Sequence, residues 1–371
     1  MFLHRLELTD YRSYQQLAVE FERRKVILLG DNAQGKTNVL ESIGMMATFK
    51  SPTARKDADI VHWGREQAII RVRARRELSE LALDMLLRTQ GRRAFRLNGL
   101  SQKRLLDVLG KLLVVWFRSE DMMLVKGGPG ERRDFLDTML VQLQVMHHQQ
   151  LQDYQRVLAQ RNQILRTWRE RPSVGLLEAW NEQLLGLALA IWRRRQALVN
   201  ALSDRVSAHH AAIAEGREAV VLRYLPAVNF EGPDDDWEPQ LREALARGFR
   251  QEVQRGQSLV GPHRDDLAFE LDGRGAKFFG SQGQQRTLVL ALKLAELEHL
   301  HRCSGEMPLL LLDDVLAELD IKRQNALLAA IGDDVQTFVT STHLNDFSAA
   351  WVDSAEIFDV TRGALTRRHT S

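Results

Sequence analysis

The stretch that decides the fold is Lys25-Val-Ile-Leu-Leu-Gly-Asp-Asn-Ala-Gln-Gly-Lys-Thr37, a short apolar run followed by a glycine-containing turn. The run predicts a buried strand, and the turn fits the phosphate-binding pattern G-x-x-x-x-G-K-[ST]. Beyond the turn, Val39, Leu40, Ile43 and Met46 recur at the spacing of one side of a helix. A strand, a glycine turn and a helix N-terminus in this order can surround an anion with backbone N–H groups. The sequence therefore predicts an α/β fold that binds a nucleoside triphosphate.

Each residue type in this loop has an expected task. We expect the Lys36 ammonium to reach the β- and γ-phosphates of ATP, and the Thr37 hydroxyl to bind Mg²⁺. The residues expected to surround the nucleotide are Gly30, Asp31, Asn32, Ala33, Gln34, Gly35, Lys36, Thr37 and Asn38.

A second apolar run, Met307-Pro-Leu-Leu-Leu-Leu-Asp-Asp314, ends in two acids. A central parallel strand is covered on both faces and reads as continuous apolar residues, as this run does. Ligands of such sheets lie beyond the carboxyl ends of the strands, where the two acids emerge. We therefore expect Asp313 to bind Mg²⁺ and Asp314 to orient or deprotonate the attacking water.

The spacing of apolar residues changes twice along the chain, from strand-like to helical and back to a mixed α/β pattern. Short strand-like patterns give way to a helical region, interrupted at Arg169–Gly175 by what reads as the turn of a helical hairpin. After an acidic loop the α/β texture returns, and the last residues, 367–371, are predicted to fray. One nucleotide-binding domain with a helical insertion explains this order. The predicted parts are residues 1–118, the N-terminal half of the ATPase head; 119–225, the inserted helical domain; and 226–371, the C-terminal half.

Composition narrows the class of protein. The formal net charge of +2 does not by itself indicate a nucleic-acid-binding protein, and the single Cys303 cannot form an internal disulfide. No apolar run approaches membrane-spanning length, and the N-terminus lacks the apolar core of a signal peptide, so we expect a cytoplasmic protein without a membrane partner.

Arginine occurs in bursts along the chain, and some of them suit DNA phosphates. Alternation along a strand puts Arg71, Arg73 and Arg75 on one face, and Arg92 and Arg93 follow in the next burst. These five are the candidate DNA contacts. The alternative is an ordinary solvated strand face.

A third element precedes a long helical stretch: the small polar cluster Ser281-Gln-Gly-Gln284. It predicts a second helix N-terminus, with a serine hydroxyl and free backbone N–H groups. Taken alone, this pattern favours a simple well-capped helix over an anion site.

Taken together, the motifs resemble those of ABC/SMC-type ATPase heads, and most of all those of the RecF family. The resemblance covers nearly the whole chain in the right order. The matching segments are Gly30–Glu41, Gly127–Asp137, Gly261–Asp266, Ser281–Thr287, Leu311–Asp320 and Thr340–His343. Segments like Gly127–Asp137 and Gly261–Asp266 occur in fewer of the ABC/SMC-type ATPases than the phosphate loop and the Leu311–Asp320 segment do.

The resemblance implies an ATP-dependent homodimer in which the signature of one subunit covers the γ-phosphate bound by the other. The signature residues, acting in trans, correspond to Ser281, Gln282, Gly283 and Gln284. By the same resemblance Asp320 lies in a dimer-contact loop and His343 approaches the γ-phosphate.

The function implied is that of an ATP-dependent DNA-binding protein in recombinational repair and replication restart. It binds single- and double-stranded DNA at gaps, with RecR and RecO as partners, and assists the loading of RecA. Many ABC ATPases carry glutamate where Asp314 stands, so we expect slow hydrolysis that serves as a switch. The glutamine loop has no clear match, because Trp116–Asp121 contains no glutamine.

Other P-loop proteins account for less of the sequence. The ATPase subunit of a membrane transporter shares the phosphate loop and the signature, but not the Asp313-Asp314 pair or the long helical hairpin. An SMC-type chromosome clamp needs hundreds of heptad residues between its halves. A P-loop kinase leaves Ser281 and His343 unexplained.

Overall fold

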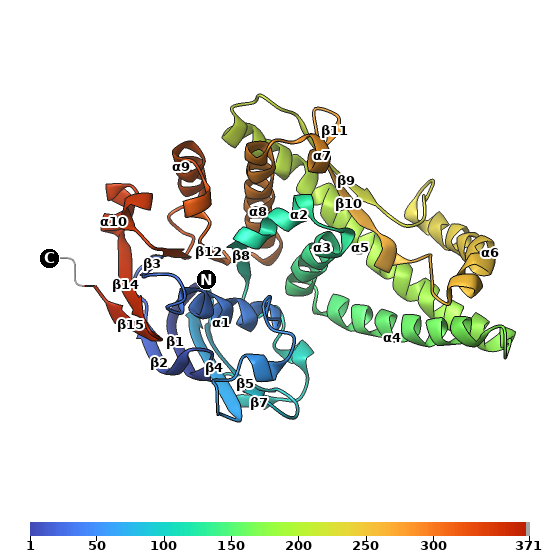
Figure 1. The fold of residues 1–371 in the computed structure, drawn as a ribbon, viewed down its shortest axis with the longest axis horizontal. Helices are drawn as coiled ribbons and strands as arrows, with labels where there is room; N and C mark the ends of the chain where they lie inside the picture. The colour runs from blue at the N-terminus through green and yellow to red at the C-terminus, as the bar shows by residue number, and fades with distance from the viewer. Residues whose placement is uncertain (369–371) are drawn as a thin grey trace. The chain divides into compact units, whose positions relative to one another are not determined.

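The computed structural model describes residues 1–368, so residues 369–371 of the tail predicted to fray lie outside the described part. The chain forms two compact units (Figure 1). The first, here called the head unit, comprises Met1–Asp121 and Leu290–Ser371. The second, here called the lobe unit, comprises Met122–Val289.

The lobe unit extends much further along the chain than the predicted helical insertion 119–225. The reason is that strands and a helix beyond residue 225 pack on the long helices of the lobe: α6 (Trp237–Arg255) contacts α4 and α5, and β10 (Asp266–Leu271) contacts α3. The helical spacing of apolar residues indicates where the insertion begins. It does not indicate which later segments pack into the core of the lobe unit.

The head unit contains a mostly parallel sheet of order β15-β14-β3-β13-β12-β8. Its strands are β3 (Lys25–Leu29), β8 (Val114–Arg118), β12 (Leu309–Asp313), β13 (Thr337–Ser341), β14 (Ala355–Thr361) and the antiparallel edge strand β15 (Ala364–Arg367). All five residues of β12 and of β13 are buried, as expected for strands covered on both faces. This confirms the strands predicted from the two apolar runs and the α/β class of the fold.

A second, antiparallel sheet of the head unit has the order β2-β1-β4-β5-β6-β7. Its strands are β1 (Phe2–Tyr11), β2 (Tyr14–Glu20), β4 (Gln67–Arg75), β5 (Glu80–Arg88), β6 (Ala94–Leu97) and β7 (Leu100–Gln102). Strand β4 alternates between buried apolar residues and arginines, and this puts Arg71, Arg73 and Arg75 on one face as predicted.

The helices of the head unit are α1 (Lys36–Thr48), α9 (Ile321–Ala330), α10 (Ala349–Ser354) and the greater part of α8 (Gln282–Ser304), whose first turns belong to the lobe unit. Within the head, the buried Lys293 of α8 lies 3.1 Å from Glu296 and 3.5 Å from Asp121, just beyond β8. This buried cluster ties α8 to the carboxyl end of β8.

The lobe unit is built on a helical hairpin of α4 (Val145–Thr167) and α5 (Val174–Ala214), which Figure 1 shows as two long neighbouring helices. The interruption predicted at Arg169–Gly175 is confirmed. The other elements are α2 (Met123–Lys126), α3 (Pro129–Leu143), β9 (Val220–Leu225), α6, β10, β11 (Arg274–Gly275) and α7 (Ala276–Phe279).

A buried ionic cluster centred on Arg195 of α5 holds the lobe together. Its guanidinium lies 2.7 Å from an Asp137 oxygen and 3.0 Å from an Asp265 oxygen. Asp265 also accepts hydrogen bonds from Trp192 Nε1, from the Tyr224 hydroxyl and from a backbone N–H. Burial raises the pKa of the Asp265 carboxyl, and these donors oppose that shift. The cluster explains why the Gly261–Asp266 segment belongs to the lobe core.

We predict that Arg195→Met destabilises the lobe by about 3–5 kcal/mol, because it leaves Asp137 and Asp265 buried without their cation. Arg193→Met, two positions away on the same helix, removes a solvent-exposed pair with Asp234 and should cost less than about 1 kcal/mol. Denaturant unfolding of the two variants checks this. Equal losses of stability would contradict the role assigned to Arg195.

Candidate nucleotide-binding site

The turn between β3 and α1 has a backbone that requires glycine at two positions. Gly35 has a φ of 111°, and a Cβ there would lie 2.9 Å from the side-chain oxygens of Ser13 and Tyr14. A Cβ on Gly30 would lie 2.4 Å from the carbonyl oxygen of Val360 in β14. The pattern G-x-x-x-x-G thus reflects both loop geometry and close packing in the head.

The turn between β1 and β2 supports this loop from outside, a role that the sequence did not predict. The Tyr14 hydroxyl donates to the Gly35 carbonyl oxygen at 3.1 Å, and Asn38 Nδ2 donates to Ser13 Oγ at 3.0 Å. On another side, the Gln34 carbonyl oxygen accepts from the Gly363 N–H at 3.2 Å. Hydrogen bonds from two sides therefore help to hold the loop in shape.

The Lys36 ammonium is folded back over the loop, where Nζ donates to the carbonyl oxygens of Gly30 at 2.6 Å and Asp31 at 3.0 Å. The first N–H groups of α1 have no partners within the helix and give its N-terminus a partial positive charge. An ammonium and a helix N-terminus around a preformed glycine turn fit the phosphates of ATP.

Three polar side chains meet at the carboxyl edge of the parallel sheet. Thr37 Oγ1 donates to Asp313 Oδ1 at 3.0 Å, and Thr340 Oγ1 lies 2.9 Å from the same oxygen. Burial, together with the nearby charges of Asp314 and Glu120, raises the pKa of Asp313 to about 6, against hydrogen bonds from both threonines that lower it. A buried carboxylate beside a hydroxyl and further acids fits a divalent cation, which would compensate this charge.

Asp314 follows the strand in a left-handed conformation, with a φ of 53°. Its backbone N–H donates to Thr340 Oγ1 at 2.8 Å, and its Oδ1 lies 3.3 Å from that oxygen. Thr340 therefore fixes both acids, although the sequence predicted no role for it. The available signal was its place near the end of a strand next to β12.

Glu120 is a further residue for which the sequence predicted no role. It follows β8 in the region expected to hold the glutamine loop, is exposed to solvent, and lies close enough to raise the pKa of Asp313. It is the structural candidate for the position left unassigned.

His343 and Asp320 lie in the loops after β13 and β12. His343 is exposed, and its backbone N–H donates to Ser341 Oγ at 3.1 Å, which orients the loop. Asp320 is the N-cap of α9 and accepts from the Arg323 N–H at 3.0 Å. Both remain available for the tasks expected of them, and those tasks stay predictions.

The signature residues Ser281, Gln282, Gly283 and Gln284 lie in the lobe unit at the start of α8. Ser281 Oγ accepts from the Gln284 N–H at 3.2 Å, while Gln284 Oε1 accepts from the Ser281 N–H at 2.6 Å. This reciprocal pair is a capping box, and Glu218 holds the Gln284 amide at 2.8 Å. The serine is thus presented on an ordered helix N-terminus.

The arginines expected to bind DNA are mostly engaged within the head unit. Arg71, Arg73 and Arg75 pair with Glu7 at 3.4 Å, Asp84 at 2.6 Å and Glu80 at 3.3 Å, respectively. Arg93 pairs with Asp57 at 2.6 Å. Arg92 alone of the five is exposed and forms no ion pair within residues 1–368.

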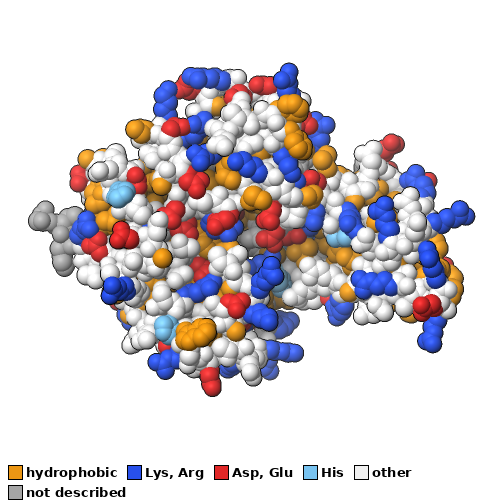
Figure 2. Space-filling view, in the orientation of Figure 1, with side chains coloured by type: hydrophobic (Ala, Val, Ile, Leu, Met, Phe, Trp, Pro, Cys, Tyr) orange, Lys and Arg blue, Asp and Glu red, His pale blue; other side chains and the backbone are white. Residues whose placement is uncertain are grey.

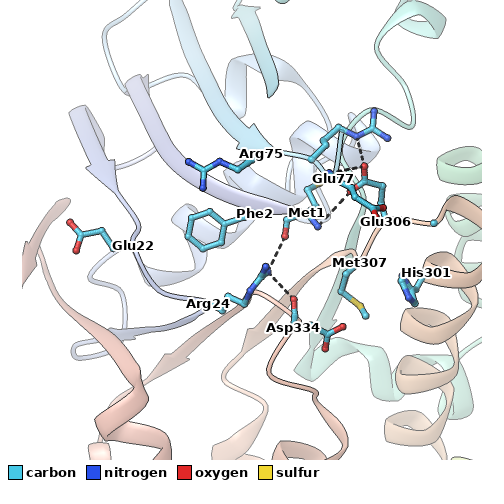
Figure 3. Close-up of a pocket in the computed structure, with 12 residues that line it drawn as sticks. Met1, Phe2, Glu22, Arg24, Arg75, Glu77, His301, Glu306, Met307 and Asp334 are labelled. Carbon is cyan, nitrogen blue, oxygen red and sulfur yellow. Dashed lines mark hydrogen bonds and ion pairs between the residues drawn. The ribbon is translucent and has the colours of Figure 1, made fainter. Parts of the chain in front are cut away.

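A cavity of about 650 Å³ lies elsewhere in the head unit. Figure 3 shows Arg24 between Met1 and Asp334, and its Nη1 lies 2.8 Å from the Asp334 carbonyl oxygen and 3.5 Å from that of Met1. Arg24 and Asp334 come just before β3 and β13, whereas the phosphate loop follows the carboxyl end of β3. The cavity is therefore separate from the nucleotide site, and it lies at the opposite edge of the sheet.

Residues 2–366 match the family of RecF/RecN/SMC N-terminal domains. The chain is 43% identical over 368 residues to the DNA replication and repair protein RecF of Gloeobacter violaceus, with 98% of each chain covered. It is 44% identical over 370 residues to that of Acaryochloris marina, covering 98% of this chain and 99% of the relative. The chain belongs to the RecF family.

The solved structures agree with this RecF assignment. The recombination mediator protein RecF with ATP, in the RecFOR pathway, superposes with a TM-score of 0.91 at 28% identity, covering 99% of this chain and 98% of that one. An SMC head bound to the C-winged helix domain of ScpA gives a TM-score of 0.57 at 15% identity, covering 100% of this chain and 98% of that one, and shares the fold only.

Membership of the RecF family decides between the functions weighed from sequence. The chain is an ABC/SMC-type ATPase head of a DNA replication and repair family, not a transporter subunit or a chromosome clamp. Among residues 1–368, no helix is both long and apolar enough to cross a bilayer.

We predict that Thr340→Val lowers the rate of ATP hydrolysis about ten-fold or more while changing ATP affinity by only a few-fold. The change removes the hydroxyl that positions Asp313 and Asp314, a loss of more than about 1.4 kcal/mol in the transition state. Phosphate release and nucleotide titration measure the two quantities. Thr340→Ser keeps the hydroxyl and should restore most of the rate; a fully active Thr340→Val would contradict this role.

Proposed function

We propose that this chain is an ATP-dependent DNA-binding protein of recombinational repair and replication restart, and that ATP acts as a switch for its dimerisation. The observation that carries the proposal is the preformed site of Lys36, Thr37, Asp313 and Thr340 at one sheet edge. The RecF relatives named for DNA replication and repair, and the RecF structure with ATP, support it.

In the proposed site, Lys36 and the α1 N-terminus bind the phosphates, while Thr37 and Asp313 would hold Mg²⁺. The ion would supply positive charge to the β- and γ-phosphate oxygens. The two loop carbonyl oxygens that Lys36 contacts hold its ammonium beside the α1 N-terminus, where the phosphates would bind.

The proposed dimer places the Ser281 helix N-terminus of one protomer over the ATP held by its partner. The capping box supports this role, because it fixes the serine and leaves its hydroxyl proton free to donate to a phosphate oxygen. Each protomer then supplies half of two equivalent sites, as a two-fold symmetric dimer requires.

The proposed hydrolysis is slow. Asp314 is one methylene shorter than the glutamate common in ABC ATPases, and the Thr340 contact holds it close to the sheet edge. Asp314 would orient the attacking water, and the exposed His343 would contact the γ-phosphate. ATP binding then closes the dimer on DNA, and hydrolysis opens it.

The proposed partners are single- and double-stranded DNA at gaps, in the cytoplasm, together with RecR and RecO. The support is family membership and the naming of a RecF structure within the RecFOR pathway. Through these partners the chain would assist the loading of RecA.

We predict that Lys36→Met abolishes ATP binding and ATP-induced dimerisation, because the phosphates lose their principal cation. Lys103→Met, an exposed lysine of the same unit, is the matched control and should behave as the unmodified protein. Sedimentation with ATP and Mg²⁺ measures the dimer. A Lys36→Met dimer of normal affinity would refute the loop assignment.

We predict that Ser281→Arg keeps ATP binding and blocks dimerisation, since a long cation at the helix N-terminus cannot fit against a partner's nucleotide. Ser173→Arg, at the N-cap of α5 in the same unit, is the control and should still dimerise. Normal dimerisation of Ser281→Arg would show that the signature does not act in trans.

We predict that Asp314→Asn binds ATP and dimerises but hydrolyses ATP at least about a hundred-fold more slowly, because the amide cannot accept a proton from water. The dimer should then persist for hours after ATP is added, whereas the dimer of the unmodified protein decays. Rapid decay of the variant dimer would argue against hydrolysis as the step that opens it.

A further inference from the structure

The indole of Trp63 is 96% exposed, the most exposed of the large apolar side chains. It lies in the turn between a short 3-10 helix, Asp57–Asp59, and β4. The turn is ordered: the Arg65 N–H donates to the His62 carbonyl oxygen at 3.0 Å, and the His62 N–H donates to the Asp10 carbonyl oxygen at 2.8 Å. A rigid turn thus presents a large aromatic face to solvent.

Exposed cations without acidic partners lie on the segments that surround this turn. They are Arg55, Lys56, Arg88 and Arg92, and within residues 1–368 none of the four forms an ion pair. In Figure 2, lysine and arginine side chains gather on the surface over the β4–β7 part of the head unit.

Strand pairing, a backbone hydrogen bond and an ion pair hold these segments at the same end of the antiparallel sheet as Trp63. Gln67, the first residue of β4, is paired with Arg88, the last residue of β5. The Thr89 N–H donates to the Glu66 carbonyl oxygen at 2.9 Å, and Arg93 binds Asp57 of the 3-10 helix at 2.6 Å. Trp63 therefore sits among free cations, whereas Arg71, Arg73 and Arg75 are already paired.

We infer that Trp63 stacks on an unpaired base of single-stranded DNA while Arg55, Lys56, Arg88 and Arg92 bind the flanking phosphates. An exposed aromatic face combined with cations is the arrangement by which proteins hold single strands without reading their sequence. Duplex DNA offers no unstacked base to such a face. The inference rests on the proposed DNA-binding function and assigns the single strand of a gap to this turn.

The same turn is connected to the phosphate loop. The His62 ring lies 2.7 Å from the Arg12 carbonyl oxygen, and Arg12 binds Glu41 of α1 through two hydrogen bonds of 2.7 and 2.8 Å. The adjoining Ser13 and Tyr14 contact Asn38 and Gly35. Hydrogen bonds therefore connect the turn that carries Trp63 to the hairpin that supports the phosphate loop.

The test compares the full-length protein with Trp63→Ala and Trp63→Phe, in ATP and Mg²⁺, on a labelled single-stranded oligothymidylate and a blunt duplex. Fluorescence anisotropy should show about a ten-fold loss of affinity for the single strand in Trp63→Ala, the size expected for one stacked base. Trp63→Phe should recover most of it. Duplex affinity should change by less than about two-fold, and the salt dependence should stay the same because no phosphate contact is lost.

Two controls complete the design. Leu78→Ala removes an equally exposed side chain, 95% accessible, at the other end of the β4–β5 hairpin, and should change nothing. Arg92→Ser should weaken binding to the single strand and reduce the salt slope of that binding by about one, because one phosphate contact is lost. Basal ATP hydrolysis should be unchanged in Trp63→Ala, while its response to single-stranded DNA should fall.

The inference is overturned if Trp63→Ala binds the single strand as tightly as the unmodified protein, or loses affinity for both DNAs equally. Unchanged DNA affinity with weaker ATP-dependent self-association would assign Trp63 to a protein contact instead. If the unmodified protein binds neither DNA, the proposed DNA-binding function fails, and the stacking site fails with it.

Discussion

The head depends on the parallel pairing of β3, β13 and β12, which brings together residues about 300 positions apart in the chain. In this register Ser341 lies beside Leu29, and Val339 beside Leu312, so the three strands end at one edge. Thr37, Thr340 and Asp313 then meet within 3.0 Å. The candidate nucleotide site is a consequence of this pairing, since no single segment contains it.

The sequence located the two strands that carry candidate site residues. Two apolar runs predicted β3 and β12, which the structure confirms, and Lys36 and Asp313 became candidates because they follow these runs. No local sequence pattern marked Thr340, Tyr14 or Glu120. Each of them interacts with a residue that is distant in the chain and that only the order of the strands brings close. The extent of the lobe was unpredictable for a similar reason, because its later strands join through the buried contacts of Asp265.

The regular spacing of arginines in the sequence was a poor guide to which side chains remain available to contact DNA. The face of β4 carries the most regular arginine row, yet each of its arginines forms an ion pair with an acid on a neighbouring strand. Arg55, Lys56, Arg88 and Arg92, which form no ion pair within residues 1–368, lie on segments around Trp63, where the sequence shows no periodicity. Pairing across strands, which depends on register, decides which charges remain available to a polyanion.

Mixing two inactive variants shows whether the serine-capped helix of one protomer completes the phosphate loop of its partner. A heterodimer of Lys36→Met and Ser281→Arg has one wholly intact composite site and one site with both defects. If the signature acts in trans, the mixture regains ATP-dependent association, and each heterodimer hydrolyses ATP at about half the rate of the unmodified dimer, although neither variant does so alone. A mixture as inactive as its components would contradict action in trans.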